Sequence, residues 1–212
     1  MKYKAFLFDL NGTMINDMPY HIKAWHKIVS NLGSALSIEQ VKRECYGKNE
    51  EVLERIFPGR FTEEEKSRIG LEKEKQYRVE FRPHLKLLNG LDDLLQKTYE
   101  EGIKMGIGSA AITLNIDFVL DGMQIRKYFD AIVGADDVTH SKPDPETFIK
   151  CAKILNIDCK SCLVFEDAPK GAEASLNAGM DCVVVNSLHL PEEFKKYKNV
   201  ISFVADFTAA EF

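Results

Sequence analysis

Hydrophobic residues near the start of the chain form a short run that ends at a carboxylate. Apolar residues 5–8 lead directly into Asp9, and the turn-forming residues Asn11 and Gly12 follow. A run this short, bounded by turn residues, predicts a buried central strand over residues 4–10. Asp9 then lies at the carboxyl end of the strand, where open α/β sheets bind ligands. Because an unpaired buried charge is costly, this position indicates a metal site, a covalent chemistry or both.

The hydrophobic pattern changes to a helical period between Pro19 and about Glu80. Ser37, Asn49 and Thr62 precede three of the periodic segments, in positions that suit helix caps. With the first segment they predict four helices and no strand. The apolar stripe of the first helix consists of Ile22, Trp25, Val29 and Leu32. Alternating Glu and Lys residues in the fourth helix predict a solvated face.

Beyond Pro83, strands and helices alternate along the chain. We expect strands over 104–108, 129–133, 163–165, 182–185 and 202–204, and helices over 91–101, 113–120, 145–155, 170–178 and 192–197. Such alternation predicts an α/β fold with a Rossmann-like parallel sheet covered on both faces. The expected domains are a core of 1–15 and 84–212 and an inserted all-helical domain of 16–83.

Composition and charge narrow the possible partners. The chain has 212 residues, of which 45% are hydrophobic, and a formal net charge of −5 without any basic run, so we expect no nucleic acid partner. No segment reaches transmembrane length and the start does not resemble a signal peptide, which predicts a cytoplasmic protein without membrane contact. A monomer is the expectation.

The five cysteines are expected to be free thiols. Cys159 and Cys162 form a C-x-x-C, for which redox chemistry or zinc binding is the functional alternative. No second pair or spaced histidine completes a zinc site. We therefore expect Cys159 to end a loop and Cys162 to begin a strand.

Four expected strand ends carry unusual polar residues. After Asp9 they are Ser109 with Ala110, then Lys142 between two prolines, then Glu166 and Asp167. Taken singly, the serine suits a helix cap, the lysine a turn and the acids a solvated surface. Taken together, acid, hydroxyl, lysine and acids follow successive strands and meet at one edge of the sheet.

One chemistry accounts for all four strand ends. Asp9 and Asp167, with Glu166 bound directly or through water, offer the oxygen ligands that Mg²⁺ prefers. Ser109 and Lys142 are suited to hold a phosphoryl group, and Asp9 to attack its phosphorus. Phosphoryl transfer needs mainly alignment and charge neutralisation, which Mg²⁺ and Lys142 would supply.

The motifs FLFDLNGT, GIGSAA, SKPDP and VFEDAPKG, in this order, resemble those of the haloacid dehalogenase superfamily, closest to its β-phosphoglucomutase-like branch. The resemblance covers essentially the whole chain, including the helical insert, which in this family is a cap that closes over the substrate. It implies Asp9 as nucleophile, and Mg²⁺ on Asp9, Asp167 and the main-chain carbonyl of Asn11. It also implies phosphate binding by Ser109 with Ala110 and by Lys142, and a small phosphorylated substrate.

Two positions depart from the family pattern. The family has an aspartate as general acid and base two residues after the nucleophile, where this chain has Asn11. An amide does not transfer a proton at neutral pH, and such help is worth about 10²–10⁴-fold. Mutases of this branch also place an arginine three residues after the cap glycine Gly47, where this chain has Glu50; Lys48 nearby lacks the bidentate fork of arginine.

Two residues of the first helix remain candidates for substrate binding. His21, in a segment that resembles the first cap helix of the mutase, is either the replacement proton carrier or a residue that binds substrate or water. Trp25 shares the apolar stripe of its helix, which favours a place in the core of the insert over a sugar platform.

The leading hypothesis is a Mg²⁺-dependent phosphatase that acts on a small phosphorylated metabolite, a sugar phosphate, through an aspartyl-phosphate. A β-phosphoglucomutase-type mutase is the first alternative, weakened by Glu50 and Asn11. A phosphometabolite-binding protein with little catalysis is the second, and it depends on Asn11 alone. Lys142 and the acidic pair argue against a metal-free dehalogenase.

Overall fold

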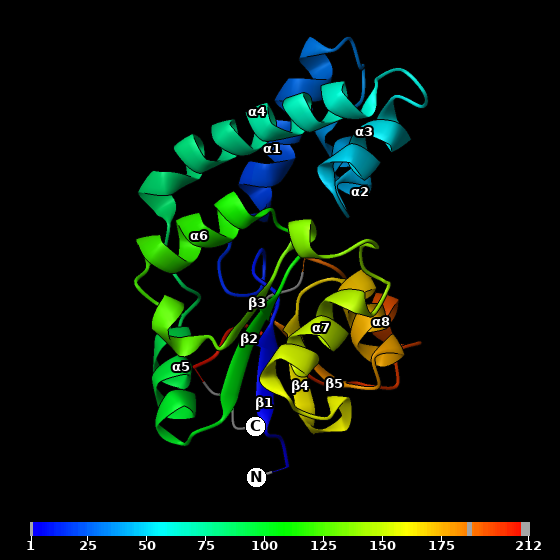
Figure 1. Cartoon of the computed structure of the whole chain (residues 1–212). Coiled ribbons are helices and arrows are strands. Elements are labelled where there is room, and N and C mark those ends of the chain that lie inside the picture. Colours follow the sequence, from blue (N-terminus) through cyan, green and yellow to red (C-terminus); the bar gives the residue numbers. More distant parts are fainter. Residues whose placement is uncertain (1, 186–187, 209–212) are drawn as a thin grey trace. The chain divides into compact units, whose positions relative to one another are not determined.

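The computed structural model describes residues 2–185 and 188–208 and contains one sheet of six parallel strands in the order β3-β2-β1-β4-β5-β6 (Figure 1). The strands are β1 (Ala5–Phe8), β2 (Lys104–Gly108), β3 (Ala131–Val133), β4 (Cys162–Glu166), β5 (Asp181–Val185) and β6 (Val200–Val204). The predicted α/β class with a Rossmann-like parallel sheet is confirmed. Since β1 pairs with both β2 and β4, Asp9 follows a central strand.

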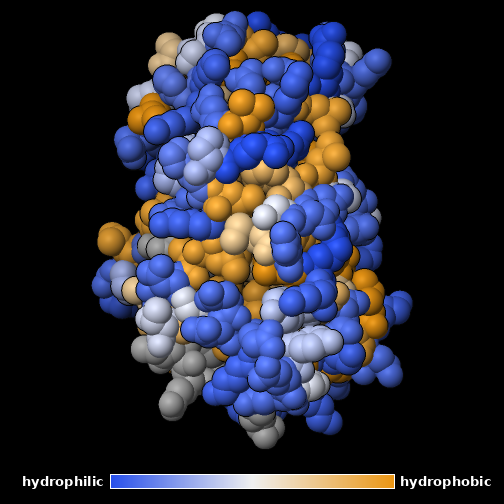
Figure 2. Space-filling model, turned by 90° about the vertical axis from the view of Figure 1, so that its left-hand side faces the viewer, coloured by the Kyte–Doolittle hydropathy of each residue, from blue (hydrophilic) through white to orange (hydrophobic). Residues whose placement is uncertain are grey.

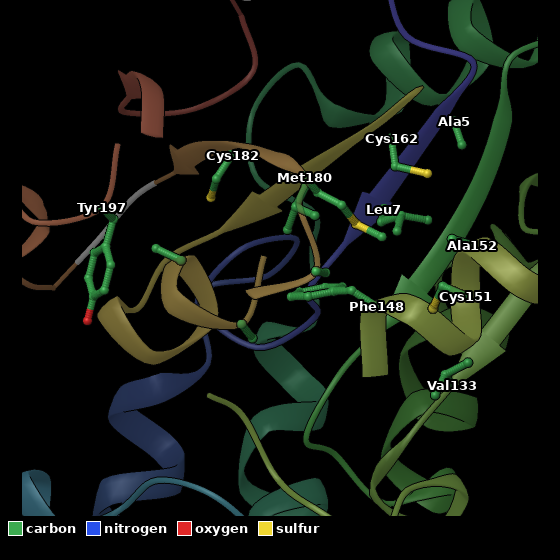
Figure 3. Packing of buried hydrophobic residues seen from close by; sticks show 14 of the residues in the cluster. Ala5, Leu7, Val133, Phe148, Cys151, Ala152, Cys162, Met180, Cys182 and Tyr197 are labelled. Carbon is green, nitrogen blue, oxygen red and sulfur yellow. The ribbon is translucent and has the colours of Figure 1, made fainter. Parts of the chain in front are cut away.

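The sheet is buried on both faces, which explains why β1 is apolar at every position. Ala5 and Leu7 belong to a cluster that includes Phe148 and Cys182 (Figure 3). Successive side chains of a strand point to opposite faces. Phe8 accordingly stacks on Phe165 of β4 at the other face, with ring centroids 4.7 Å apart.

Helices follow the strands as the sequence predicts. They are α5 (Leu91–Glu100), α6 (Thr113–Gly122), α7 (Glu146–Leu155) and α8 (Pro169–Asn177). Figure 1 shows α5 on one side of the sheet and α7 and α8 on the other. Short 3-10 helices are η1 (Arg82–His84), η2 (Arg126–Tyr128), η3 (Ala135–Asp137), η4 (Cys159–Ser161) and η5 (Pro191–Phe194). The helix expected over 192–197 is thus a single 3-10 turn, and Cys159 begins such a turn instead of ending a loop.

The segment after Asn16 folds into the four expected helices. They are α1 (Met18–Asn31), α2 (Ile38–Glu44), α3 (Asn49–Ile56) and α4 (Glu63–Phe81). Ser37 and Thr62 cap α2 and α4 as predicted. The expectation for Asn49 is wrong: it is the first residue of α3, and Lys48 occupies the cap position. The Glu51 carboxylate accepts the Lys48 backbone N–H at 3.0 Å, so the helix start is satisfied from within the helix.

Contacts among the described residues divide the chain into two units, one up to Asn16 and from Lys86 onward, the other Asp17–Leu85. The predicted domain limits lie within two residues of this division, but 16–83 as an independent domain stays a prediction, and the expected end at 212 lies outside the described residues. Figure 2 shows groups of hydrophobic residues as well as hydrophilic ones on the face that it draws. No helix in the described part of the chain is long and apolar enough to span a membrane.

Candidate active site

Asp9 lies beside the end of β4 because of the strand register. Phe8 pairs with Phe165, and the Asp9 backbone N–H donates to the Phe165 carbonyl at 2.9 Å. The next residue of β4 is Glu166, so the carboxylates of Asp9 and Glu166 stand at neighbouring positions at the ends of two adjacent strands. Both are buried, with Asp9 7% and Glu166 2% exposed. Buried charges of like sign require a nearby cation.

Lys142 supplies a cation at this edge of the sheet. Its Nζ lies 2.7 Å from Asp9 Oδ1 and 2.7 Å from Glu166 Oε1. Its Nζ also lies 4.6 Å from the ring centroid of Phe148, which allows a cation–π contact. Burial disfavours the charged amine, but the adjacent carboxylates outweigh it and raise the pKa of Lys142 above its ordinary value. Lys142 therefore stays a cation at neutral pH.

Asp167 completes a group of three buried carboxylates. Ligand oxygens of Asp9, Glu166 and Asp167 all lie within 4.8 Å of one another. Asp167 approaches closely because Gly12, at φ +81°, has no side chain: a Cβ there would overlap the Asp167 carboxylate. Hard divalent cations prefer such carboxylate oxygens. The donor set thus fits Mg²⁺, for which Asp9, Asp167 and the main-chain carbonyl of Asn11 remain the predicted ligands, with Glu166 bound directly or through water.

Ser109 lies at the same sheet edge, two residues beyond Ile107, which pairs with Phe8. Its backbone N–H donates to the Val133 carbonyl at 3.0 Å, and its Oγ accepts the Ala111 N–H at 3.2 Å. The cap alternative for Ser109 is wrong, since Ile112 is the cap residue of α6. Ser109 and the half-buried Ala110 therefore directly follow β2, at the edge that carries Asp9. Their contact with phosphate stays a prediction.

Asp136 accepts hydrogen bonds from the first residue of α6, a role that a cap residue of the helix would otherwise have. Its Oδ2 accepts the Thr113 backbone N–H at 2.8 Å and the Thr113 hydroxyl at 2.7 Å. Sequence spacing gives no signal for this contact, because 23 positions separate Asp136 from Thr113. Asp136 holds the α6 end of the loop that contains Ser109 and Ala110.

His21 belongs to a buried polar group within the helical insert. Its Nδ1 lies 2.7 Å from Lys73 Nζ, and its Nε2 lies 3.3 Å from Asp17 Oδ2. Lys73 also donates to Glu74 Oε1 at 2.9 Å. Both ring nitrogens of His21 therefore have charged neighbours inside the insert, and its role in proton transfer or substrate binding stays a prediction.

The expectation of a solvated charged face on α4 fails at Lys66, Lys73 and Glu74, which are buried. Lys73 and Tyr77 lie one helical turn apart on the face that contacts His21, and this i,i+4 spacing was the available signal. Trp25 lies in the apolar core of the insert at 3% exposure, with Lys73 Nζ 5.2 Å from its ring centroid. Burial agrees with the core alternative, and substrate contact by Trp25 stays a prediction.

Arg55 organises the loop that contains Gly47 and Lys48. Its guanidinium donates to the carbonyls of Glu44, at 2.7 Å, and Tyr46, and stacks 3.7 Å from the centre of the Tyr46 ring. Gly47 provides the left-handed conformation of this turn at φ +79°. Lys48 and Glu50 are half-buried at the start of α3. Sequence reasoning did not identify Arg55, because its role depends on a contact with the preceding loop.

Comparison with known proteins agrees with this architecture. A model of the haloacid dehalogenase-like hydrolase family matches residues 6–185. Fructose-1-phosphate phosphatase YqaB from Escherichia coli (strain K12) is 29% identical over 187 residues, covering 88% of this chain and 98% of that protein. Beta-phosphoglucomutase from Bacillus subtilis (strain 168) is 32% identical over 190 residues, covering 86% and 83%. The crystal structure of beta-phosphoglucomutase from Clostridium difficile has a TM-score of 0.87 at 30% identity, covering 99% and 94%.

The chain therefore belongs to the haloacid dehalogenase-like hydrolase family. Its relatives are phosphatases and beta-phosphoglucomutases of that family, so the protein is an enzyme of this hydrolase and mutase type. The predicted resemblance to the β-phosphoglucomutase-like branch is confirmed.

Proposed function

We propose that this protein is a Mg²⁺-dependent phosphatase that transfers the phosphoryl group of a small sugar phosphate to Asp9. The observation that carries the proposal is the ion pair between Lys142 and Asp9, 2.7 Å long, beside a buried three-carboxylate cluster. Relatives named fructose-1-phosphate phosphatase and phosphorylated carbohydrates phosphatase support a sugar phosphate as the substrate class.

The chemistry assigned to the chain's own residues has two steps. An Asp9 carboxylate oxygen attacks phosphorus, the ester P–O bond breaks, and the sugar oxygen leaves and takes a proton. Water then attacks the phosphorus of the aspartyl-phosphate, which releases inorganic phosphate and restores the carboxylate. Mg²⁺, when bound, supplies neutralisation of the negative charge on the transferred group.

Lys142 is suited to both steps. An ammonium group has three N–H donors, of which two serve Asp9 and Glu166. The third is proposed to bind a phosphoryl oxygen, together with Ser109. Since Asn11 offers no ionisable proton, water is the proposed proton source for the leaving oxygen. This arrangement predicts faster reaction of substrates with good leaving groups than of alkyl esters.

The test is phosphate release from a panel that includes fructose 1-phosphate, β-glucose 1-phosphate and acetyl phosphate, with and without Mg²⁺. The matched variant is Asp9→Asn, which keeps the shape of the side chain but removes the nucleophile. We expect the unmodified protein to release phosphate from at least one compound when Mg²⁺ is present, and Asp9→Asn to release none. Absence of Asp9-dependent release from every compound would refute the phosphatase, and tight binding without turnover would favour a phosphometabolite-binding protein.

A β-phosphoglucomutase activity is the second candidate, favoured by the 32% identity with the Bacillus subtilis enzyme. It predicts conversion of β-glucose 1-phosphate to glucose 6-phosphate in the presence of a glucose bisphosphate that primes the reaction. Glu50 in place of an arginine disfavours the binding of a second phosphate group. Formation of glucose 6-phosphate faster than release of inorganic phosphate would decide for the mutase.

The proposal includes a cytoplasmic monomer. Analytical ultracentrifugation of the purified protein tests the oligomeric state, and a monomer should have a mass of 24.1 kDa.

A further inference from the structure

Gly171 lies in the first turn of α8, where its own backbone conformation does not require glycine. The positive-φ glycines of the described residues do not include it. Glycine is among the least favourable residues inside a helix, because it loses the most conformational freedom on folding. A packing reason must therefore explain glycine at this position.

The Glu166 side chain supplies that reason. A Cβ placed on Gly171 would overlap the Glu166 carboxylate, including Cδ and both oxygens. Glu166 is 2% exposed, so its carboxylate has no route to water that would compensate for displacement. Alanine at 171 and the observed position of the Glu166 carboxylate are therefore mutually exclusive.

Each oxygen of the Glu166 carboxylate is engaged where it lies. Oε2 accepts the backbone N–H groups of Asp167, at 2.8 Å, and Ala168, at 3.0 Å, at the start of α8. Oε1 accepts from Lys142 Nζ at 2.7 Å, and the same Nζ donates to Asp9 Oδ1 at 2.7 Å. Negative charge is favourable at a helix start. Glu166 thus connects the start of α8 to the lysine that contacts the proposed nucleophile.

We propose that Gly171 is a positioning residue for Lys142, because its missing side chain leaves the volume in which Glu166 holds the lysine against Asp9. Glu166 is then the anchor of Lys142 as well as a member of the carboxylate cluster that is predicted to hold the metal. The consequence for catalysis rests on the proposed function, in which Lys142 binds the phosphoryl group, whereas the placement of Lys142 does not.

The first experiment measures Lys142 directly and needs no substrate. The purified protein is treated briefly with acetic anhydride, and acetylation of Lys142 is quantified by mass spectrometry relative to the exposed Lys104. We expect Gly171→Ala to increase the relative acetylation of Lys142 by about 10-fold or more, since a released lysine loses a charge-assisted hydrogen bond. Ala174→Gly, which weakens the same helix away from Glu166, is the matched control and should leave this ratio unchanged.

The second experiment is a double-mutant cycle on kcat/KM for the best substrate found. Gly171→Ala and Glu166→Ala should each lower kcat/KM by about 10- to 100-fold. The double variant should equal Glu166→Ala within about two-fold, because the overlap no longer exists without the carboxylate. Losses that multiply in the double variant, or unchanged Lys142 acetylation in Gly171→Ala, would overturn the proposal.

If Gly171→Ala does not fold, the double variant carries the test. Recovery of a cooperative thermal transition in Glu166→Ala/Gly171→Ala supports the steric coupling, and failure of the double variant beside a folded Glu166→Ala contradicts it. If no substrate is found, the acetylation result still decides the placement of Lys142 independently of the proposed function.

Discussion

The Tyr77 hydroxyl donates a hydrogen bond of 2.5 Å to Asp17 Oδ2, across 60 positions of the chain. Both side chains are fully buried, and the His21 ring stacks on Tyr77 with centroids 3.7 Å apart. Burial, with the adjacent Asp17 charge, raises the pKa of Tyr77 above its ordinary value, so the phenol remains a donor at neutral pH. This bond connects the start of α1 to the last third of α4 within the helical insert.

Tyr77→Phe should therefore destabilise the protein. The change removes a donor from a buried carboxylate and should lower the free energy of unfolding by about 1–3 kcal/mol. Urea unfolding followed by circular dichroism measures this loss. Tyr99→Phe, at an exposed tyrosine, is the control and should change stability by less than about 0.5 kcal/mol. Equal stability of the two variants would contradict the importance of the Asp17 contact.

Lys142→Met should destabilise the metal-free protein strongly. It leaves Asp9 and Glu166 without their shared cation, and breaking a buried ion pair from one side costs about 3–5 kcal/mol. Mg²⁺ should recover part of the loss, because it restores positive charge beside the same carboxylates. Unfolding in EDTA and in Mg²⁺ measures both effects, with the exposed Lys153→Met as control. A Lys142→Met protein as stable as this control would refute the ion-pair network.

Asn11→Asp should increase kcat/KM for fructose 1-phosphate by about 10²–10⁴-fold, because an aspartate can protonate the leaving sugar oxygen. The gain should be much smaller for acetyl phosphate, whose leaving carboxylate needs no proton. Initial rates of the unmodified and Asn11→Asp proteins on both substrates measure the two gains in kcat/KM. Asn11→Ser controls for loss of the amide. Equal gains on the two substrates would argue against a missing general acid.

Asp167→Asn should weaken Mg²⁺ binding by at least about 10-fold, since a proposed charged ligand becomes neutral. Isothermal titration of the metal-free protein with Mg²⁺ measures the affinity without any substrate. Asp92→Asn, an exposed position on α5, is the charge-matched control and should bind Mg²⁺ as the unmodified chain does. Unchanged Mg²⁺ affinity in Asp167→Asn would show that the metal does not bind at this carboxylate cluster.

The buried thiols should make the protein sensitive to alkali. Burial raises the pKa of Cys151 and of Cys162 to about 12 in the folded chain. An unfolded chain loses these protons near pH 8.5, so between about pH 9 and 12 the folded state binds more protons and its stability falls as pH rises. Below about pH 8 this contribution is constant. Thermal unfolding from pH 7 to 11 measures the slope, which Cys151→Ala should reduce.

The sequence alone determined the sheet and most of the polar residues that lie at its edge. A continuous apolar run suffices for β1 because both of its faces are buried, and four polar strand ends at one edge follow from parallel alternation. Local signals also sufficed for the caps at Ser37 and Thr62, which depend on residues three positions apart. Hydrophobic periodicity and turn-forming residues act over a few positions, so they can be recognised in the sequence without the structure.

The tertiary structure alone decided which polar residues pair. The charged run of α4 has the composition of a solvated face, yet Lys73 lies buried beside His21, 52 positions away. Likewise, Asp136 instead of Ser109 serves the start of α6, and Gly171 matters only because the Glu166 carboxylate occupies the space beside it. Such contacts join distant segments, and their energies depend on burial and distance, which sequence spacing does not contain.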